Sequence, residues 1–250
     1  MGQEAVGSED IALAEKRLEG HLRLYGWQHE LTLSVARDLI HLFHLADEAD
    51  RDRAMAVVGA FLANSAIVHG DDSLEYFYAV IDFAGVLLLF GEHDLAIAEL
   101  LQTMRRMSDF PDWDDGFSAV ACRDLVTAEL AIERFDDAIA HAEWLFEEVG
   151  TEEHDDPFTE RNLLEVMAFY ACALLRQGAE DRALEWATAW LARAEVAPDE
   201  HEVFVDMRGL DILRHIDHVL ADGLDDEWLD EIVPRIEELT GFVFEDVSDT

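Results

Sequence analysis

The chain has 250 residues, of which 57 are Asp or Glu and only 17 are Lys or Arg, so its formal net charge at pH 7 is −40. This acidic excess argues against nucleic acid as a partner, because binding a phosphate backbone requires clustered Lys and Arg. Half of the residues are hydrophobic, which is enough for a sizeable folded core.

The distribution of the acidic residues is informative. A disordered acidic tail would concentrate them in a segment without hydrophobics, and an acidic surface for one basic partner would be local. Here they are spread over amphipathic segments, and Lys16 is the only lysine. This composition resembles that of halophile proteins from a cytoplasm with molar salt. Such salt shortens the screening length from about 10 Å at 0.1 M to about 3 Å at 1 M, which weakens self-repulsion.

Helical periodicity dominates the chain from the N-terminus to about residue 240. Glycines 70, 91, 150, 178 and 223 are expected just past helix ends, where a left-handed backbone is easiest for glycine. Asp72 and Glu75 have the spacing of a capping box at a helix start. Eleven helices are predicted, at 8–24, 28–48, 51–67, 72–90, 92–107, 113–131, 135–149, 157–177, 179–196, 199–221 and 225–240.

A repeat organises these helices. Four alanines recur at intervals of 42, 42 and 45 residues, each with Asp two positions earlier and an aliphatic residue or Met one position later. A period in this range is typical of stacked helical hairpins. The alanines are Ala54, Ala96, Ala138 and Ala183. The predicted hairpins are 28–67, 72–107, 113–149, 157–196 and 199–240.

The hairpins resemble tetratricopeptide (TPR) repeats. A bulky–small step in the first helix appears as Phe83-Ala84 and Tyr170-Ala171, and the recurring alanine takes the place of the small residue in the second helix. Repeats of 42 to 45 residues exceed the family's usual 34. The resemblance implies an all-α fold, a right-handed solenoid of antiparallel hairpins. The expected domains are a capping helix in 1–27, the repeat domain in 28–241 and a frayed tail in 242–250. An irregular helical bundle is the alternative.

The same resemblance implies a function. The first helices of such hairpins line a concave groove that binds a peptide or helix of a protein partner. Aromatic and Arg side chains are good anchors in an interface. The residues expected to line the groove are Tyr78, Ile81, Arg123, Thr127 and Glu165. The alternative for each of these residues is that it packs in the core or faces bulk solvent.

Two histidine pairs provide an alternative function. His41 and His44, like His215 and His218, are three residues apart and so share a helix face that could supply two metal ligands. With Asp211 beside it, the second pair is the best candidate for a helical metal protein or enzyme. No phosphate-binding loop and no nucleophile-elbow motif occurs in the sequence. We therefore expect a non-catalytic scaffold without a cofactor.

The remaining expectations concern location and thiols. The N-terminus lacks the basic start and apolar stretch of a signal peptide, and residues 80–90, the most apolar run, are too few to cross a bilayer. The chain is expected to be cytoplasmic. Cys122 and Cys172 lie in apolar helical stretches without metal-type spacing, so both are expected to be buried free thiols.

Overall fold

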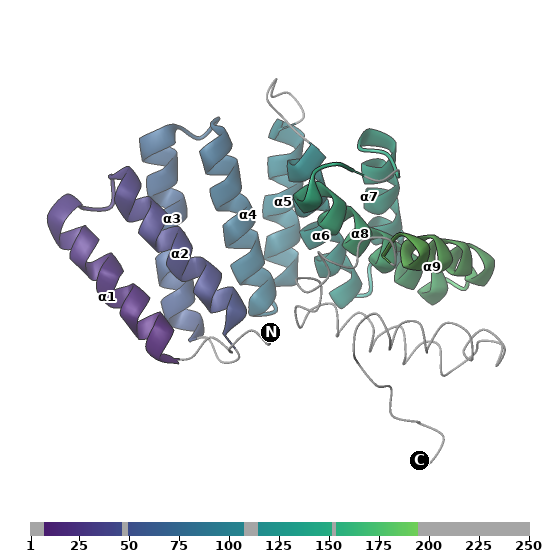
Figure 1. Cartoon of the computed structure of the whole chain (residues 1–250), viewed down its shortest axis with the longest axis horizontal. Helices are drawn as coiled ribbons and strands as arrows, with labels where there is room; N and C mark the ends of the chain where they lie inside the picture. The colour runs from purple at the N-terminus through teal and green to yellow at the C-terminus, as the bar shows by residue number, and fades with distance from the viewer. Residues whose placement is uncertain (1–7, 47–49, 108–114, 152–153, 195–250) are drawn as a thin grey trace, which may run out of the picture. The chain divides into compact units, whose positions relative to one another are not determined.

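The computed structural model describes residues 8–46, 50–107, 115–151 and 154–194. Within these ranges the chain forms nine α-helices and no β-strand (Figure 1). The helices are α1 (Ser8–Tyr25), α2 (Glu30–Leu45), α3 (Arg51–His69), α4 (Leu74–Leu89), α5 (His93–Met107), α6 (Asp115–Ala131), α7 (Phe135–Glu148), α8 (Pro157–Arg176) and α9 (Glu180–Ala194).

The predicted all-α fold is confirmed for these residues, and every observed helix end lies within three residues of its predicted position. Gly70 and Gly91 have positive φ angles of 91° and 74° just past helix ends, as their positions predicted. The predicted position of the N-cap at this helix start was wrong by one residue. Ser73, not Asp72, is the N-cap of α4, and its hydroxyl accepts the Tyr76 N–H at 3.1 Å.

Several predictions fall outside the described residues. They are the helices at 199–221 and 225–240, the fifth hairpin that these would form, and the tail after residue 241. The residues of the second histidine pair and its acid, Asp211, His215 and His218, also lie there. The proposed metal site at that position therefore stays a prediction.

The chain divides into two compact units, Met1–Trp113 and Asp114–Thr250. The first contains α1 to α5 and the second contains α6 to α9. Consecutive helices pack as the hairpins α2–α3 and α4–α5 in the first unit, and α6–α7 and α8–α9 in the second. The expected division into a capping helix, one repeat domain and a tail stays a prediction.

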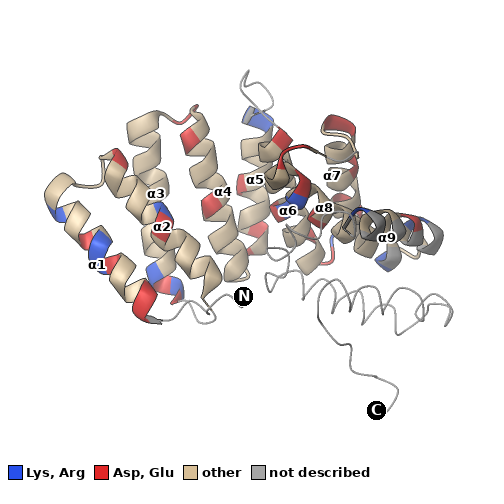
Figure 2. Ribbon diagram, viewed as in Figure 1, with Lys and Arg blue, Asp and Glu red and all other residues tan. Residues whose placement is uncertain are grey.

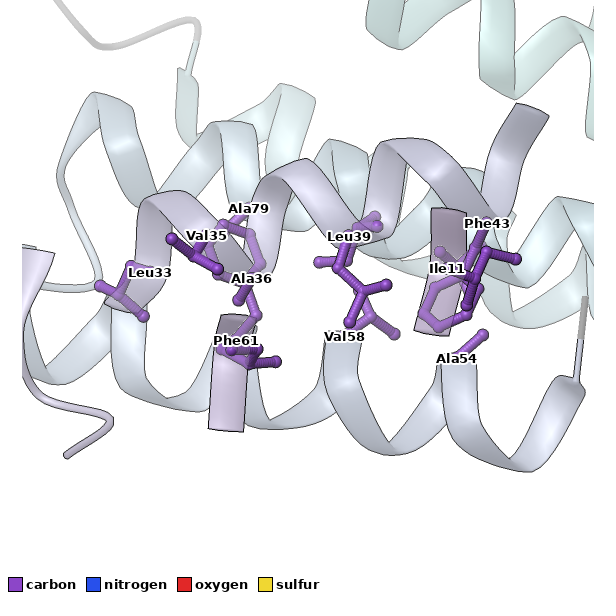
Figure 3. Close-up of a cluster of buried hydrophobic side chains, with 13 residues drawn as sticks. Ile11, Leu33, Val35, Ala36, Leu39, Phe43, Ala54, Val58, Phe61 and Ala79 are labelled. Carbon is purple, nitrogen blue, oxygen red and sulfur yellow. The ribbon is translucent and has the colours of Figure 1, made fainter. Parts of the chain in front are cut away.

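The core of the first unit gathers side chains from four helices. Leu39 and Phe43 of α2 are almost completely buried against Val58 of α3 (Figure 3). Ile11 of α1 and Ala79 of α4 belong to the same cluster. A Nε–Oε1 contact of 2.8 Å between Arg53 and Glu15 also ties α3 to α1. Burial of these apolar faces, at about 25 cal/mol per Å², is the main stabilising contribution.

The recurring alanines hold one structural position. Each is the fourth residue of the second helix of its hairpin, in α3, α5, α7 and α9. Ala54, Ala96 and Ala138 are 0% exposed and Ala183 is 5% exposed. A side chain this small lets neighbouring helix backbones approach closely. The spacing in the sequence therefore reports a repeated packing contact, as predicted.

The core of the second unit has an aromatic centre. The Tyr170 ring lies edge-on to Phe146 and to Trp186, at centroid distances of 5.4 and 4.9 Å, and Phe146 stacks on Trp186 at 4.5 Å. Edge-to-face and offset contacts of this kind add to the stabilisation by burial. They join α7, α8 and α9, so the bulky residue of the Tyr170-Ala171 step fastens two hairpins together.

Among the described helices, none combines the length and the apolar character that a bilayer crossing requires.

Candidate partner-binding faces

In the first unit, the first helices α2 and α4 pack against each other and pair their polar side chains. Asp82, on α4, is buried, and its carboxylate accepts a 2.8 Å hydrogen bond from Arg37 Nε of α2. His41 Nε2, one turn further along α2, lies 3.6 Å from the other Asp82 oxygen. The side chains of Arg37 and His41 are 40% and 53% exposed. A buried acid thus holds two accessible nitrogen-bearing groups at the surface.

Tyr78 completes this arrangement. The guanidinium carbon of Arg37 lies 5.1 Å from the centroid of the Tyr78 ring, which is a cation–π contact. Tyr78 is partly exposed, whereas Ile81 is only 7% exposed. We call Arg37, His41, Tyr78 and Asp82 the first-unit polar face.

Gly85 is tightly packed against α2. A Cβ at this position would lie 3.1 Å from Cε1 of His44. The glycine therefore makes room for a histidine of the same protein, which the sequence did not predict.

The second unit repeats the arrangement between its own first helices, α6 and α8. Arg123 donates to Asp124 Oδ1 at 2.7 Å and to Asn162 Oδ1 at 2.6 Å, and its Nε lies 3.6 Å from Glu165 Oε2. Arg161 approaches the other Glu165 oxygen at 3.3 Å. We call these five residues the second-unit polar cluster.

The second-unit polar cluster is far less accessible than the first-unit polar face. The side chains of Arg123, Asp124 and Glu165 are 16%, 4% and 20% exposed. The Thr127 hydroxyl donates to the Arg123 backbone carbonyl at 2.8 Å within the same helix. Of the predicted groove residues, the structure therefore brings Arg123, Thr127 and Glu165 together, while Tyr78 and Ile81 lie on α4 of the first unit.

Both arrangements share one pattern that the sequence analysis missed. An Arg on one first helix reaches an acid on the next first helix, from Arg37 to Asp82 and from Arg123 to Glu165. The separations are 45 and 42 residues, whereas the alanine intervals between the same hairpins are 42 and 45, so the two pairs do not occupy equivalent repeat positions. The repeat length alone therefore does not identify Arg37 and Asp82 as partners.

The first histidine pair does not form a metal site. His41 faces Asp82, and His44 packs on Gly85. No group of three or more His, Cys, Asp or Glu side chains in the described ranges is arranged to hold a metal ion.

The two thiols are unsuited to nucleophilic chemistry. Cys122 and Cys172 are free and buried, as predicted. Burial raises the pKa of Cys122, assisted by the nearby Glu129 carboxylate, and raises the pKa of Cys172 to about 12. Cys122 Sγ donates to the His141 backbone carbonyl at 3.3 Å, while the Nδ1 atom of the His141 ring lies 3.0 Å from Glu129 Oε2. Both thiols are protonated at neutral pH, and the thiolate is the reactive form.

A further polar group lies where α7, α8 and α9 meet. The Tyr170 hydroxyl donates to Glu143 Oε1 at 2.7 Å, and Arg182 Nη2 donates to the same oxygen at 2.9 Å. The hydrogen bond from Tyr170 lowers the pKa of Glu143, and Arg182 lowers it further. Burial, together with the Glu143 carboxylate, raises the pKa of Tyr170 to about 12. These hydrogen bonds join α7, α8 and α9.

The solved structures that resemble the chain include two of one helical-repeat protein. One is the crystal structure of a Podosopora anserina protein assigned as a kinesin light chain with nearly identical TPR-like repeats. It is 16% identical, with a TM-score of 0.60 over 76% of this chain and 88% of that one. The chain has a TPR-like fold. The other structure, of a variant of the same Podosopora anserina protein, is also 16% identical, with a TM-score of 0.61 over 74% and 85% of the two chains. No family model and no curated protein matches the sequence.

Proposed function

We propose that the chain is a non-catalytic interaction scaffold or adaptor that binds a peptide or helix of a protein partner on the faces of its first helices. The observation that carries this proposal is the recurring Arg–acid pair between successive first helices, of which the first-unit polar face is accessible. The TPR-like fold supports the same function, because it presents successive helices as an extended surface.

The first-unit polar face supplies the anchoring groups. Arg37 has a planar guanidinium with donors left over after one bond to Asp82, and its contact with the Tyr78 ring limits its motion. A partner carboxylate or backbone carbonyl can accept from the exposed edge of this group. Tyr78 offers an amphipathic ring beside it, the kind of residue that is enriched at energetically important interface positions. Ile81 would contribute an apolar contact beneath these polar groups.

In the second unit, Arg123, Thr127 and Glu165 are proposed to line the same kind of surface. Their mutual bonds hold the side chains in one geometry, which reduces the entropy lost when a partner binds. Because these three side chains are less exposed than those of the first-unit polar face, they would contribute less contact area with a partner and would act mainly through the shape of the surface. The proposed setting is a cytoplasm with high salt. Salt screens the attraction between distant charges there, so only charges in direct contact with the partner would contribute to binding.

The proposal is tested with the tagged full chain, purified at high salt from cells that express it. We expect defined partner proteins to be retained by the wild type and depleted at least fivefold by Arg37→Ala and by Tyr78→Ala. The variant Arg23→Ala is the matched control for the arginine, and Tyr25→Ala is the control for the tyrosine. Both control residues are exposed on α1, where Arg23 pairs only within its own helix, with Glu19.

Each variant is compared with the wild type by circular dichroism to establish equal helicity. The retained proteins are quantified by mass spectrometry. Identical retention by the face variants and the control variants would refute the assignment of the first-unit polar face, and an absence of specific partners would refute the scaffold function.

A further inference from the structure

The second unit contains a fully buried carboxylate that the proposed binding faces do not use. Glu129 lies in the last turn of α6 and is 0% exposed. Its Oε2 atom lies 3.0 Å from Nδ1 of His141 on α7, and its Oε1 atom is buried without a hydrogen-bond partner among the described residues. Removing a carboxylate from water is costly unless a positive charge and hydrogen bonds offset the loss.

No Lys or Arg balances this carboxylate in the part of the chain that the structure describes. α7 contains five acidic residues and neither Lys nor Arg (Figure 2). The one basic residue of α6, Arg123, is engaged in the second-unit polar cluster. Asp82 of the first unit differs, because Arg37 gives it a permanent cation. A proton on His141 is therefore the positive charge that can neutralise the buried pair.

The other charged and titratable side chains of the packed elements do not take this role. α8 packs against both α6 and α7, and its side chains of this kind are Glu160, Arg161, Glu165, Tyr170, Cys172 and Arg176. Those of α7 besides His141 are Asp136, Asp137, Glu143, Glu147 and Glu148. The turn between α6 and α7 contributes Glu133 and Arg134, and α6 itself contributes Asp115, Cys122, Arg123 and Asp124. Within the described ranges, none of these side chains makes a hydrogen bond or ion pair with the Glu129 carboxylate or the His141 ring.

The pair is linked to water on one side and to a thiol on the other. The His141 side chain is 27% exposed, so its ring can exchange a proton with solvent. Cys122 Sγ donates to the backbone carbonyl of His141 at 3.3 Å, and this thiol is 0% exposed. Access to Cys122 therefore depends on whether α6 and α7 stay together at this point.

We propose that Glu129 and His141 form a proton-dependent latch between α6 and α7. One proton makes the pair neutral, as an imidazolium beside a carboxylate, and keeps the two helices closed over Cys122. Release of this proton leaves a buried negative charge whose single partner is a neutral ring. The hairpin then opens more often, and opening brings the Cys122 thiol into contact with water.

The direction of the pH effect follows from proton binding. In the unfolded chain, His141 gives up its proton in the neutral range while Glu129 is ionised. The folded pair retains the proton, because burial opposes the uncompensated charge that its loss would leave. Above neutral pH the opened and unfolded states therefore bind fewer protons than the closed state, so the closed state becomes less stable as the pH rises.

The latch is tested by brief alkylation of the full chain with iodoacetamide at constant high salt. Cys122 and Cys172 are both free and buried, and each reacts as a thiolate when it is transiently exposed. The ratio of their alkylation rates removes the pH dependence that thiols share. We expect this ratio of Cys122 to Cys172, measured by mass spectrometry of the two peptides, to rise at least about threefold from pH 6 to pH 9. A wild-type ratio that stays constant over this range would overturn the proposal.

Two substitutions fix the two states of the latch. Glu129→Gln keeps the size of the side chain and can accept from His141 but carries no charge, so the ratio is expected to stay at the wild-type value for pH 6. His141→Gln can donate to Glu129 but cannot take up a proton, so the ratio is expected to stay near the wild-type value for pH 9. His154→Gln, at a half-buried histidine of the same unit, is the matched control and is expected to keep the wild-type rise.

Circular dichroism at pH 6 establishes whether each variant has the wild-type helicity. Urea unfolding provides a second measurement that does not depend on Glu129→Gln. From pH 6 to pH 9, the unfolding equilibrium constant of the wild type is expected to rise at least about threefold more than that of His141→Gln. Equal rises would overturn the proposal. A wild-type rise in the alkylation ratio that persists in Glu129→Gln, or that disappears in His154→Gln, would also overturn it, because another group would then release the proton.

Discussion

The two units arrange the same kind of polar pair in different surroundings. In the first unit, Arg37 is 40% exposed and Asp82 has Arg37 and His41 as partners. In the second, Arg123 is 16% exposed and contacts two acids and an amide. The more deeply a charged group is buried, the more partners it needs to offset the loss of water. The buried cluster therefore serves mainly stability, and the open pair is the better candidate for binding.

The two units also differ in net charge. Residues 1–113 contain 20 acidic and 8 basic side chains, a net charge of −12, whereas residues 114–250 contain 37 and 9, a net charge of −28. Self-repulsion grows with net charge and is reduced by salt. The second unit therefore depends more on screening than the first.

The largest expected effect follows from this difference. Lowering the salt from about 2 M to 50 mM is expected to unfold the protein, and residues of α6 to α9 are expected to lose protection before those of α1 to α5. Hydrogen exchange resolved by peptide mass spectrometry measures the order, and circular dichroism measures the total helicity. Full helicity at 50 mM salt would contradict the prediction of a salt-dependent fold.

The next effect compares the two arginines. Arg123→Ala leaves Asp124 without Arg123 and leaves Glu165 with Arg161 alone, and breaking a buried pair in this way costs about 3–5 kcal/mol. Arg37→Ala leaves Asp82 with His41, and the loss of one charged hydrogen bond costs about 1.5–3 kcal/mol. Urea unfolding at constant high salt measures both free energies.

Arg23→Ala is again the control for this pair, since the Arg23 and Glu19 side chains are 74% and 69% exposed and such contacts contribute less than about 1 kcal/mol. Equal costs for Arg37→Ala and Arg123→Ala would show that burial does not distinguish the two arrangements.

A smaller effect is expected within the second unit. Tyr170→Phe keeps the ring against Phe146 and Trp186 and removes only the hydroxyl that donates to Glu143. The loss of one hydrogen bond to a charged group is expected to cost about 1.5–3 kcal/mol, which urea unfolding at pH 7 would measure. Tyr25→Phe, at an exposed tyrosine of the first unit, is expected to change little. Similar costs for the two variants would mean that the Tyr170 hydroxyl contributes nothing specific.

The smallest effect depends on pH. Because the pKa of Glu143 is lower in the folded chain than its ordinary value of 4.5, its contribution to stability is fully present above pH 4.5 and is lost as the pH falls through the folded value. The contribution is below about 1 kcal/mol, since the Glu143 side chain is 45% exposed. Unfolding free energies at pH 6 and pH 3.5 are expected to differ less for Tyr170→Phe than for the wild type. An identical difference would exclude Tyr170 as the cause of the shift.

Local patterns in the sequence determined the helices and the repeat. Helix periodicity and punctuation by glycine act within a few residues, so the helix limits followed from them, and the alanine interval predicted a buried contact in each hairpin. The acidic excess and the absence of phosphate-binding and nucleophile-elbow motifs also needed no structure.

Only the tertiary structure decided which polar residues meet. Arg37 and Asp82 are 45 residues apart and become partners because α2 and α4 pack side by side, and the space at Gly85 is filled by His44 for the same reason. The exposure of Ile67 likewise follows from which sides of α3 its neighbours cover. Helical periodicity identifies a face but not its neighbour, since that depends on packing between segments distant in the chain.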